Sequence, residues 1–381
     1  MSTVRITGVA TTEFGRHHDR TLASISQEAA LAALDDAGIS AQQVEAVVFS
    51  NAAEGVLRGQ EMIRAQVSLR GSGLDGLPMF NTENACASGS SAVHLGWNLV
   101  LSGRAASVLI VGAEKLHHEN KVKSFEAIES GIDRSIPIDT NVQGSAMLAA
   151  YANEALAYAR EHGDVRAALA AIAVKNRHAA SLTDFAQFRQ PITPADVAAS
   201  RMVSDPLRLL MCSPVTDGAA ALVLRASNDR ADGPRVASSE VASHGGGSHV
   251  VEAAVRRVYE DVDCSAEDID VFQLHDASSI AELIQYEQVG LTPVGTARDV
   301  VLEGRTAVTG DRPVNTDGGL MSRGHALGAT GVAQLVELTR QLRGNATGRQ
   351  VNGATSGLAV NAGGWMGNDY ATCVATILTS E

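Results

Sequence analysis

Segments with the pattern of buried strands alternate with amphipathic helical segments, and this alternation constrains the fold more than any other feature of the sequence. Residues 3–10 and 44–52 have the pattern of strands. Residues 21–40, between them, have the pattern of a helix that Gly38 is placed to end. The segment ASVLIVGAE, residues 106–114, is almost entirely apolar, which is typical of a strand inside a sheet. This order of elements predicts an α/β fold.

The same order of elements returns later in the chain. A strand at 268–277 is followed by a helix at 281–290, a glycine-rich turn, a helix from Gly328 and a last strand at 370–378. The repeat is one of element order and not of residues. A chain of 381 residues suits two domains or one large layered body.

We therefore predict two halves, with boundaries at 1–245 and 246–381. Residues from about 115 to 200 are more polar than their surroundings and contain short helical runs such as NEALAYAREHG. We predict that they form an inserted region of the first half that lies over the core.

Charge and composition exclude several classes of function. The net charge is −13 and Lys and Arg form no run, so a nucleic-acid-binding surface is not expected. No apolar run reaches ~18 residues, and the N-terminus lacks the apolar core of a signal peptide. These features predict a cytoplasmic protein without a membrane span. The 4 cysteines show neither a CxxC pair nor a Cys/His metal pattern, which predicts reduced thiols and no metal site.

Cys86 lies in NACASGSSAVHLG, residues 84–96, where small residues precede a helical pattern that runs to about Ser102. A cysteine in the first turn of a helix lies at the positive end of the helix dipole, which favours the thiolate. Small neighbours also let a substrate approach the backbone closely. A buried cysteine in a tight helix–sheet contact fits this stretch equally well, so the segment alone leaves both interpretations open.

Two histidines follow in contexts that suit catalysis. His325 lies in RGHALGATG, a glycine-rich turn before a long amphipathic helix, where it could take a proton from a thiol or donate to an oxyanion. His275 lies in FQLHDASS at a strand end, where ligands of α/β sheets collect. Its neighbour Asp276 is predicted to cap the next helix. The alternative for His325 is a loop histidine that bonds the backbone.

The segment VNAGGWMGNDYATC, residues 360–373, contains a backbone turn before the last strand. The N–H groups near Gly363 and Gly364 could face a ligand there, and Asn361 adds a polar side chain. The strong alternative to a ligand-binding turn is an ordinary loop in which the glycines only allow unusual backbone angles. Cys373 falls inside an apolar strand and is predicted to belong to the core.

The chain resembles the thiolase superfamily, and the resemblance covers nearly its whole length. Four features carry it, taken together and in this order: Cys86, His275, His325 and the Gly363–Gly364 turn. RGHALGATG is similar to the GHPxGxTG segment of thiolases, with Ala326 in place of proline. Three segments are similar to thiolases of the sterol-carrier type, namely residues 175–189, residues 205–224 and the HDA at 275–277.

The resemblance implies a five-layered α/β/α/β/α fold with two pseudo-repeated halves, and an acyltransferase activity. It implies that Cys86 attacks an acyl-CoA to form an acyl-enzyme, and that His325 activates Cys86. Backbone N–H groups of Cys86 and Gly364 would form an oxyanion hole, and His275 would bind the carbonyl of the second substrate.

The resemblance also implies the ligands and partners. Coenzyme A thioester would be a substrate, and no cofactor would be bound permanently. Since coenzyme A carries phosphates, a local basic cluster is expected, and Arg177, Arg189 and Arg208 are the candidates. A homodimer is expected, with 106–114 as part of its interface. Some proteins of this kind also work with a small OB-fold partner that holds acyl-CoA.

One departure from the thiolase pattern affects the chemistry. Thiolases use a second cysteine as acid/base, and the two positions where it is found are occupied here by Asn361 and Ala277. Three outcomes follow: an acyltransferase whose acceptor carbon is already nucleophilic, a thiolase with a substitute base, or a subunit that performs another carbon–carbon reaction such as thiolysis or retro-aldol cleavage. A non-catalytic scaffold is the alternative to all three.

Overall fold

The computed structural model describes residues 3–135, 145–245 and 247–381. Its main sheet has nine strands in the order β3-β2-β4-β7-β1-β8-β11-β10-β9. The strands are β1 (Val4–Thr11), β2 (Ala46–Ser50), β3 (Met79–Thr82), β4 (Ser107–Lys115), β7 (Asp217–Ala226), β8 (Arg235–Ser243), β9 (Val271–Gln273), β10 (Ser356–Gly363) and β11 (Thr372–Thr379). A small separate sheet pairs β5 (Met202–Ser204) with β6 (Leu207–Arg208).

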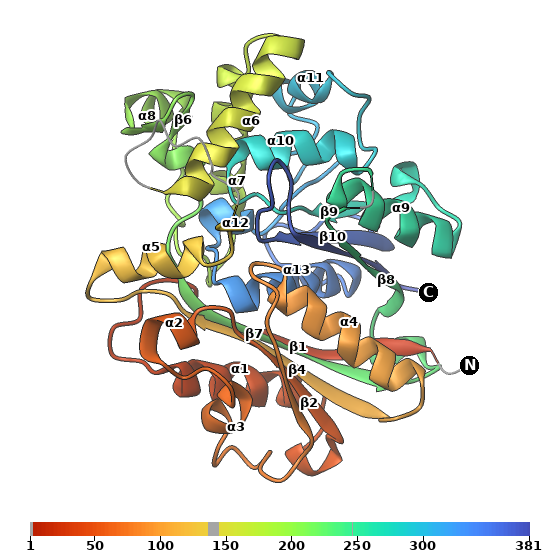
Figure 1. The fold of residues 1–381 in the computed structure, drawn as a ribbon. Coiled ribbons are helices and arrows are strands. Elements are labelled where there is room, and N and C mark those ends of the chain that lie inside the picture. The colour runs from red at the N-terminus through yellow and green to blue at the C-terminus, as the bar shows by residue number, and fades with distance from the viewer. Residues whose placement is uncertain (1–2, 136–144, 246) are drawn as a thin grey trace.

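The helices complete five layers (Figure 1). They are α1 (Leu22–Asp36), α2 (Glu54–Arg58), α3 (Arg64–Ser68), α4 (Ser88–Leu101), α5 (Lys121–Glu129), α6 (Ala146–His162), α7 (Arg166–Ser181), α8 (Pro194–Ala199), α9 (Val250–Val262), α10 (Ser279–Gln288), α11 (Ala297–Leu302), α12 (Gly319–Ser322) and α13 (Leu327–Leu342). Helix α13 packs on β1, β4 and β7 with one side and on β9 and β10 with the other, and α4 also contacts strands of both halves. Helices α1 and α9 cover the outer faces. The predicted five-layered α/β fold is confirmed.

Strand β1 joins the two halves, because it pairs with β7 along its length and meets β8 through Arg5 and Arg235. The predicted division near residue 245 stays a prediction. The predicted insertion contains α5, α6, α7 and α8, and Figure 1 shows these helices beside the layered body. Residues 136–144 of this insertion lie outside the described residues.

Glycines let α4 and α13 approach each other at the centre of the molecule. A Cβ atom on Gly89 would lie 2.8 Å from the carbonyl oxygen of Gly328, and one on Gly331 would lie 2.4 Å from the Ser90 nitrogen. These distances are too short for any side chain. The close crossing therefore explains the small residues of both motifs, and it brings the segment before α4 next to the loop before α13.

Strand β4 lies between β2 and β7, and all of its residues are buried. Its hydrogen-bonding edges are thus already occupied, so residues 106–114 cannot pair with a second subunit, contrary to the expectation above. The outer strands of the sheet are β3 and β9. The homodimer itself stays a prediction. None of the helices in the described ranges is long and apolar enough to cross a membrane.

Candidate active site

Three side chains from distant parts of the chain meet in one pocket. Cys86 lies two residues before α4, His275 lies two residues after β9, and His325 lies between α12 and α13. The sulfur and one nitrogen of each ring lie within 4.8 Å of one another. The two imidazole rings are 5.3 Å apart between centroids and nearly perpendicular, at 81°. The structure thus brings together the three residues on which the predicted mechanism depends.

Cys86 is a neutral thiol in this environment. Burial raises the pKa of its thiol to about 12; hydrogen bonds from the backbone of Gly364 and of Cys86 itself oppose the rise, and the charge of Glu114 adds to it. The expectation that the helix dipole favours the thiolate was wrong. Helix α4 begins only at Ser88, so Cys86 does not lie in its first turn, and the apolar surroundings of the sulfur outweigh the partial charge of the helix end.

This pKa predicts how fast the free enzyme is alkylated. With this pKa, the neutral thiol remains the main form of Cys86 throughout the range from pH 7 to pH 9.5. Only the thiolate reacts with iodoacetamide, so the rate of modification should rise roughly tenfold per pH unit over this range. Peptide mass spectrometry of quenched samples measures the rate at Cys86 alone. A rate that levels off below pH 8 would show instead that the site stabilises the thiolate.

A hydrogen bond fixes the tautomer of His325. Its Nδ1 lies 2.8 Å from the Thr330 hydroxyl, and that hydroxyl donates in turn to the carbonyl of Ala326 at 3.0 Å. Since the hydroxyl has one proton to give, it accepts from Nδ1–H, and we assign the lone pair to Nε2. Burial first, and then the nearby His275 ring and the charge of Arg323, hold the pKa of His325 well below its usual value. A neutral ring with a free Nε2 can accept the proton of Cys86.

Asn361 fixes the opposite tautomer in His275. The amide nitrogen of Asn361 lies 3.1 Å from His275 Nδ1 and donates to it. The Ser90 hydroxyl lies 2.9 Å from Asn361 Oδ1 and 3.0 Å from the Ala87 carbonyl, so the two oxygens share its one proton. We therefore assign the ring proton of His275 to Nε2. Burial lowers the pKa of His275 to about 3, so the ring is neutral. Its Nε2 is buried without a partner among the described residues, and His275 lines the pocket.

The turn at the end of β10 supplies a backbone donor. Gly364 has φ +65°, and a Cβ atom there would lie 2.9 Å from Ala371 Cβ and 3.0 Å from the Gly131 carbonyl. A glycine is required here by both backbone angle and space. Hydrogen bonding from its backbone lowers the pKa of the Cys86 thiol, against the larger effect of burial. That the N–H groups of Gly364 and Cys86 form an oxyanion hole stays a prediction.

The pocket around these groups is small and apolar, with a volume of about 80 Å³. Helices α5 and α6 of the insertion close one side of it. Its apolar lining includes Phe125, Ile128, Met147, Tyr151, Val215 and Tyr370. Sequence reasoning missed the two tyrosines, whose hydroxyl oxygens lie 3.5 Å apart. Tyr370 falls inside the motif at 360–373 and could have been found there, whereas nothing in the pattern around Tyr151 singles it out.

The three arginines expected to bind coenzyme A are not brought together at this pocket. Arg177 is buried, lies over the Phe188 ring at 4.6 Å and donates to Ser322. Arg189 pairs with Glu13 at 3.3 Å, and Arg208 donates to the Ser200 carbonyl at 2.7 Å. None of the three lines the Cys86 pocket as the structure describes it. Their role in binding coenzyme A stays a prediction.

Asp276 caps a helix, but a different one from the helix expected. Its carboxylate accepts from the backbone N–H groups of Leu320 and Met321 in α12, at 2.6 and 3.2 Å. Ser278 caps the following helix, α10, in its place. Through α12, Asp276 holds the segment that leads to His325, so its role is one of positioning.

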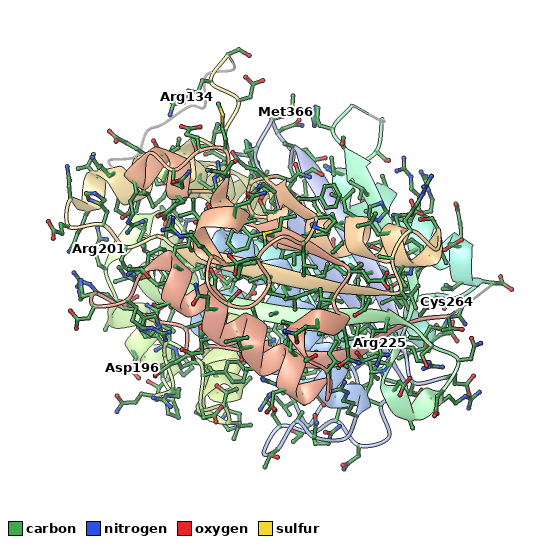
Figure 2. The ribbon with its side chains drawn as sticks, turned by 90° about the horizontal axis from the view of Figure 1, so that it is seen from below. Arg134, Asp196, Arg201, Arg225, Cys264 and Met366 are labelled. Atoms are coloured by element: carbon green, nitrogen blue, oxygen red, sulfur yellow. The ribbon has the colours of Figure 1, made fainter. Side chains whose placement is uncertain are left out.

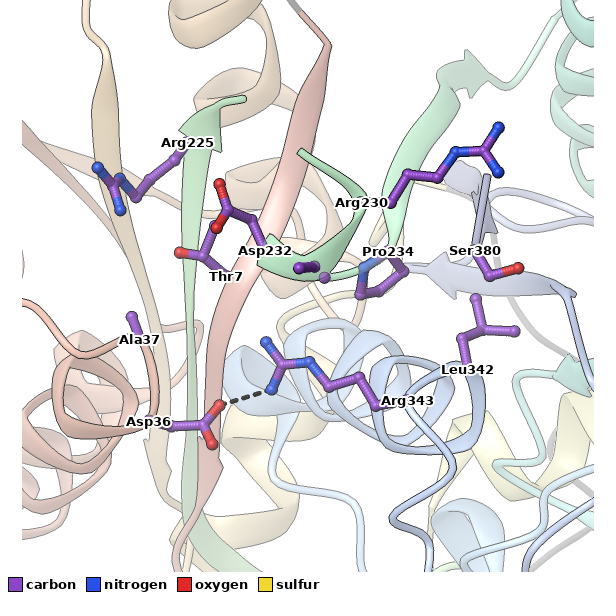
Figure 3. Close-up of a pocket in the computed structure, with 12 residues that line it drawn as sticks. Thr7, Asp36, Ala37, Arg225, Arg230, Asp232, Pro234, Leu342, Arg343 and Ser380 are labelled. Carbon is purple, nitrogen blue, oxygen red and sulfur yellow. Dashed lines mark hydrogen bonds and ion pairs between the residues drawn. The ribbon is translucent and has the colours of Figure 1, made fainter. Parts of the chain in front are cut away.

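A larger cavity of about 460 Å³ lies elsewhere, between Arg225, Arg230 and Arg343 (Figure 3). Arg343 forms an ion pair with Asp36 at 2.7 Å there. The cavity lies where β7 and β11 end, whereas Gly364 stands beside the start of β11. It contains neither cysteine nor histidine. The predicted nucleophile and both predicted catalytic histidines therefore lie at the smaller pocket and not at this cavity.

Comparisons with known proteins concern the family of the chain and not its individual site residues. A family model described as "Thiolase, N-terminal domain" matches residues 4–228, and one described as "Thiolase C-terminal domain-like" matches residues 239–376. "Acetyl-CoA acetyltransferase" of Methanothermobacter thermautotrophicus is 36% identical, over 96% of this chain and 97% of the relative. "Benzoylsuccinyl-CoA thiolase subunit BbsB" of Thauera aromatica is 33% identical, over 91% of each chain.

Two further similarities complete the comparison. "Sterol carrier protein 2" of Gallus gallus is 32% identical, over 94% of this chain and 69% of the relative. Among solved structures, "Ltp2-ChsH2(DUF35) aldolase" aligns with a TM-score of 0.79 at 23% identity, over 99% of this chain and 97% of the other. This structural likeness concerns the fold alone.

Proposed function

Because this chain belongs to the thiolase family, we propose that it transfers an acyl group from an acyl-CoA to a carbon acceptor through an acyl-enzyme on Cys86. The observation that carries the proposal is the convergence of the Cys86 sulfur with His325 and His275 within 4.8 Å. The names of the relatives support an acyltransferase as the class of enzyme. Coenzyme A thioester is a substrate in this proposal, and no permanently bound cofactor is needed.

In the first step, Cys86 Sγ attacks the thioester carbonyl while its proton moves to His325 Nε2. The high pKa of the thiol requires that proton transfer accompany attack, since little thiolate is present beforehand. The backbone groups of Cys86 and Gly364 stabilise the tetrahedral oxyanion. His325 then gives the proton to the departing coenzyme A thiolate, and the acyl group remains on Cys86. In the second step, the acceptor carbon attacks the acyl carbon, the acyl–sulfur bond breaks, and the departing Cys86 thiolate takes up the proton that the acceptor loses. Nε2–H of His275 binds the acceptor carbonyl.

The first half of this reaction can be tested without knowing the acceptor. Intact-protein mass spectrometry after mixing with short, aromatic and long acyl-CoAs should show one acyl-sized gain, which Cys86→Ala abolishes. Cys264→Ala is the matched control, because Cys264 lies at the edge of the molecule (Figure 2) and is partly exposed. A gain that survives in Cys86→Ala, or no gain with any donor, would contradict the acyl-enzyme.

A second candidate function is thiolysis as one subunit of a complex. The observation that favours it is the relative named as a thiolase subunit, at 33% identity. In that case a small partner would hold the acyl-CoA, and coenzyme A would be the acceptor. Mass gain on Cys86 that appears from a 3-oxoacyl-CoA only in the presence of such a partner, and is removed by free coenzyme A, would favour this candidate.

A further inference from the structure

The cavity of about 460 Å³ in Figure 3 lies where β1 meets β8, away from the Cys86 pocket. The two strands pair only at Arg5 and Arg235. Residues 230–234 cover the place where the pairing stops, since the Pro234 carbonyl accepts from the N–H of Ile6 at 2.9 Å. The C-terminal end of α13 forms another wall. That helix has 16 residues, a length of about 24 Å, and its other end follows the catalytic loop.

A β-bulge turns Thr7 toward this cavity. The register of β1 against β7 shifts between Ile6 and Gly8, so Thr7 has no partner in β7. Bulges are a common means of re-aiming one side chain of a strand. Thr7 lines the cavity and is only 7% exposed, and its buried hydroxyl has no hydrogen-bond partner among the described residues. Such a hydroxyl is unfavourable unless a bound molecule satisfies it. It therefore indicates a ligand with polar atoms.

The walls of the cavity carry more positive than negative charge. They contain three arginines and two aspartates, namely Arg225, Arg230, Arg343, Asp36 and Asp232. The two carboxylates have partners of their own: Asp36 pairs with Arg343 at 2.7 Å, and Asp232 accepts from the Ser227 hydroxyl. Of the three arginines, Arg343 alone forms an ion pair with a residue that the structure describes. The positive charge of Arg225 and Arg230 is thus left for a ligand.

Two further arginines stand beside the cavity. Arg5 donates to the Gly233 carbonyl of the wall at 2.8 Å, and its Nε is buried without a partner in the described part of the chain. Arg235 is its neighbour across the strand pair. Burial, and then the charges of Arg230 and Arg235, lower the pKa of Arg5, so these like charges lie close enough to repel one another. In a protein with a net charge of −13, this concentration of arginines indicates an anionic ligand.

We propose that this cavity binds a compact anion with two phosphoryl groups. The planar guanidinium group bonds phosphate oxygens in pairs. Arg225 and Arg230 stand on opposite sides in Figure 3, with Arg343 between them, so the cations suit an anion whose charge is spread over two groups. The Thr7 hydroxyl donates to one of the phosphoryl oxygens. None of the described lining residues is aromatic, so the cavity offers no ring on which a nucleobase could stack.

Isothermal titration calorimetry with inorganic pyrophosphate, at fixed ionic strength, tests the proposal. We expect one site per chain, and we expect Arg225→Gln and Arg230→Gln each to weaken binding about tenfold. Arg256→Gln is the matched control, because Arg256 is a 61% exposed arginine of α9 that does not line the cavity. No binding to the wild type, or an unchanged affinity in both cavity variants, would overturn the proposal.

Thr7→Val tests the bulge, since it keeps the volume and removes only the hydroxyl. It should weaken binding about fivefold without lowering the stability of the free protein, and an unchanged affinity would contradict this role. Citrate, which carries carboxylates instead, should bind at least tenfold more weakly than pyrophosphate. Equal affinity for citrate would overturn the assignment to phosphoryl groups.

Competition separates this cavity from any site for coenzyme A. Free coenzyme A should leave pyrophosphate binding unchanged, and displacement by coenzyme A would overturn the proposal, because pyrophosphate would then occupy the substrate site. Cys86→Ala should bind pyrophosphate as the wild type does. The result therefore does not depend on whether the acyl-enzyme forms.

Discussion

Replacing His325 with alanine is expected to slow acyl-enzyme formation by roughly 10³-fold, the range of a well-placed general base. The effect is large because the Cys86 thiol, with its pKa raised to about 12, cannot ionise without a proton acceptor near neutral pH. Rapid-quench mass spectrometry with the best acyl-CoA donor measures the rate. In the variant, hydroxide must take the proton, so the rate should rise about tenfold per pH unit, more steeply than in the wild type.

Two controls separate this role from a general loss of structure. His178→Ala removes an exposed histidine of α7 and should leave the rate unchanged. Thr330→Val removes the partner of His325 Nδ1 but keeps Nε2 near the sulfur, so about a tenfold loss is expected. If His325→Ala retained a tenth of the wild-type rate with an unchanged pH profile, another group would be the base.

These local contacts show which parts of the site could be predicted from the sequence. Thr330 lies five residues after His325 in the same glycine-rich motif, and Gly364 lies in a motif whose two glycines already indicate a special backbone. The fold was predictable for a related reason, since strand and helix patterns are local. Helix α1, for example, begins after Thr21 and ends before Gly38, as its caps require.

The electrostatics of the site depends on long-range packing and could not be predicted in the same way. The position of Cys86 near a helix start indicated a thiolate, but helices α5 and α6, about 40 to 60 residues further along the chain, close the pocket and desolvate the sulfur. Arg177 is a predicted phosphate ligand, and its position over the Phe188 ring could not be read from the sequence. Asp276 likewise caps a helix 44 residues away. Residue type alone carries no signal for such partners.

The largest loss of stability is expected from Arg323→Ala, which should lower the free energy of unfolding by about 3–5 kcal/mol. Arg323 and Asp317 form an ion pair at 2.5 Å, and their side chains are 0% and 1% exposed. Removing the guanidinium leaves a buried carboxylate without its counter-ion, and the low-dielectric interior makes that state costly. Denaturation in guanidinium chloride, followed by fluorescence and circular dichroism, measures the change.

Arg166→Ala is the matched control for this substitution. Arg166 pairs with Asp164 at 3.1 Å, but the two side chains are 58% and 67% exposed, so its loss should cost less than about 1 kcal/mol. The double variant Arg323→Met with Asp317→Leu should recover much of the stability, because it removes both charges and keeps the volume. Equal effects of Arg323→Ala and Arg166→Ala would contradict the argument. Since the charge of Arg323 also lowers the pKa of His325, the double variant should raise that pKa and test how the pair tunes the base beside Cys86.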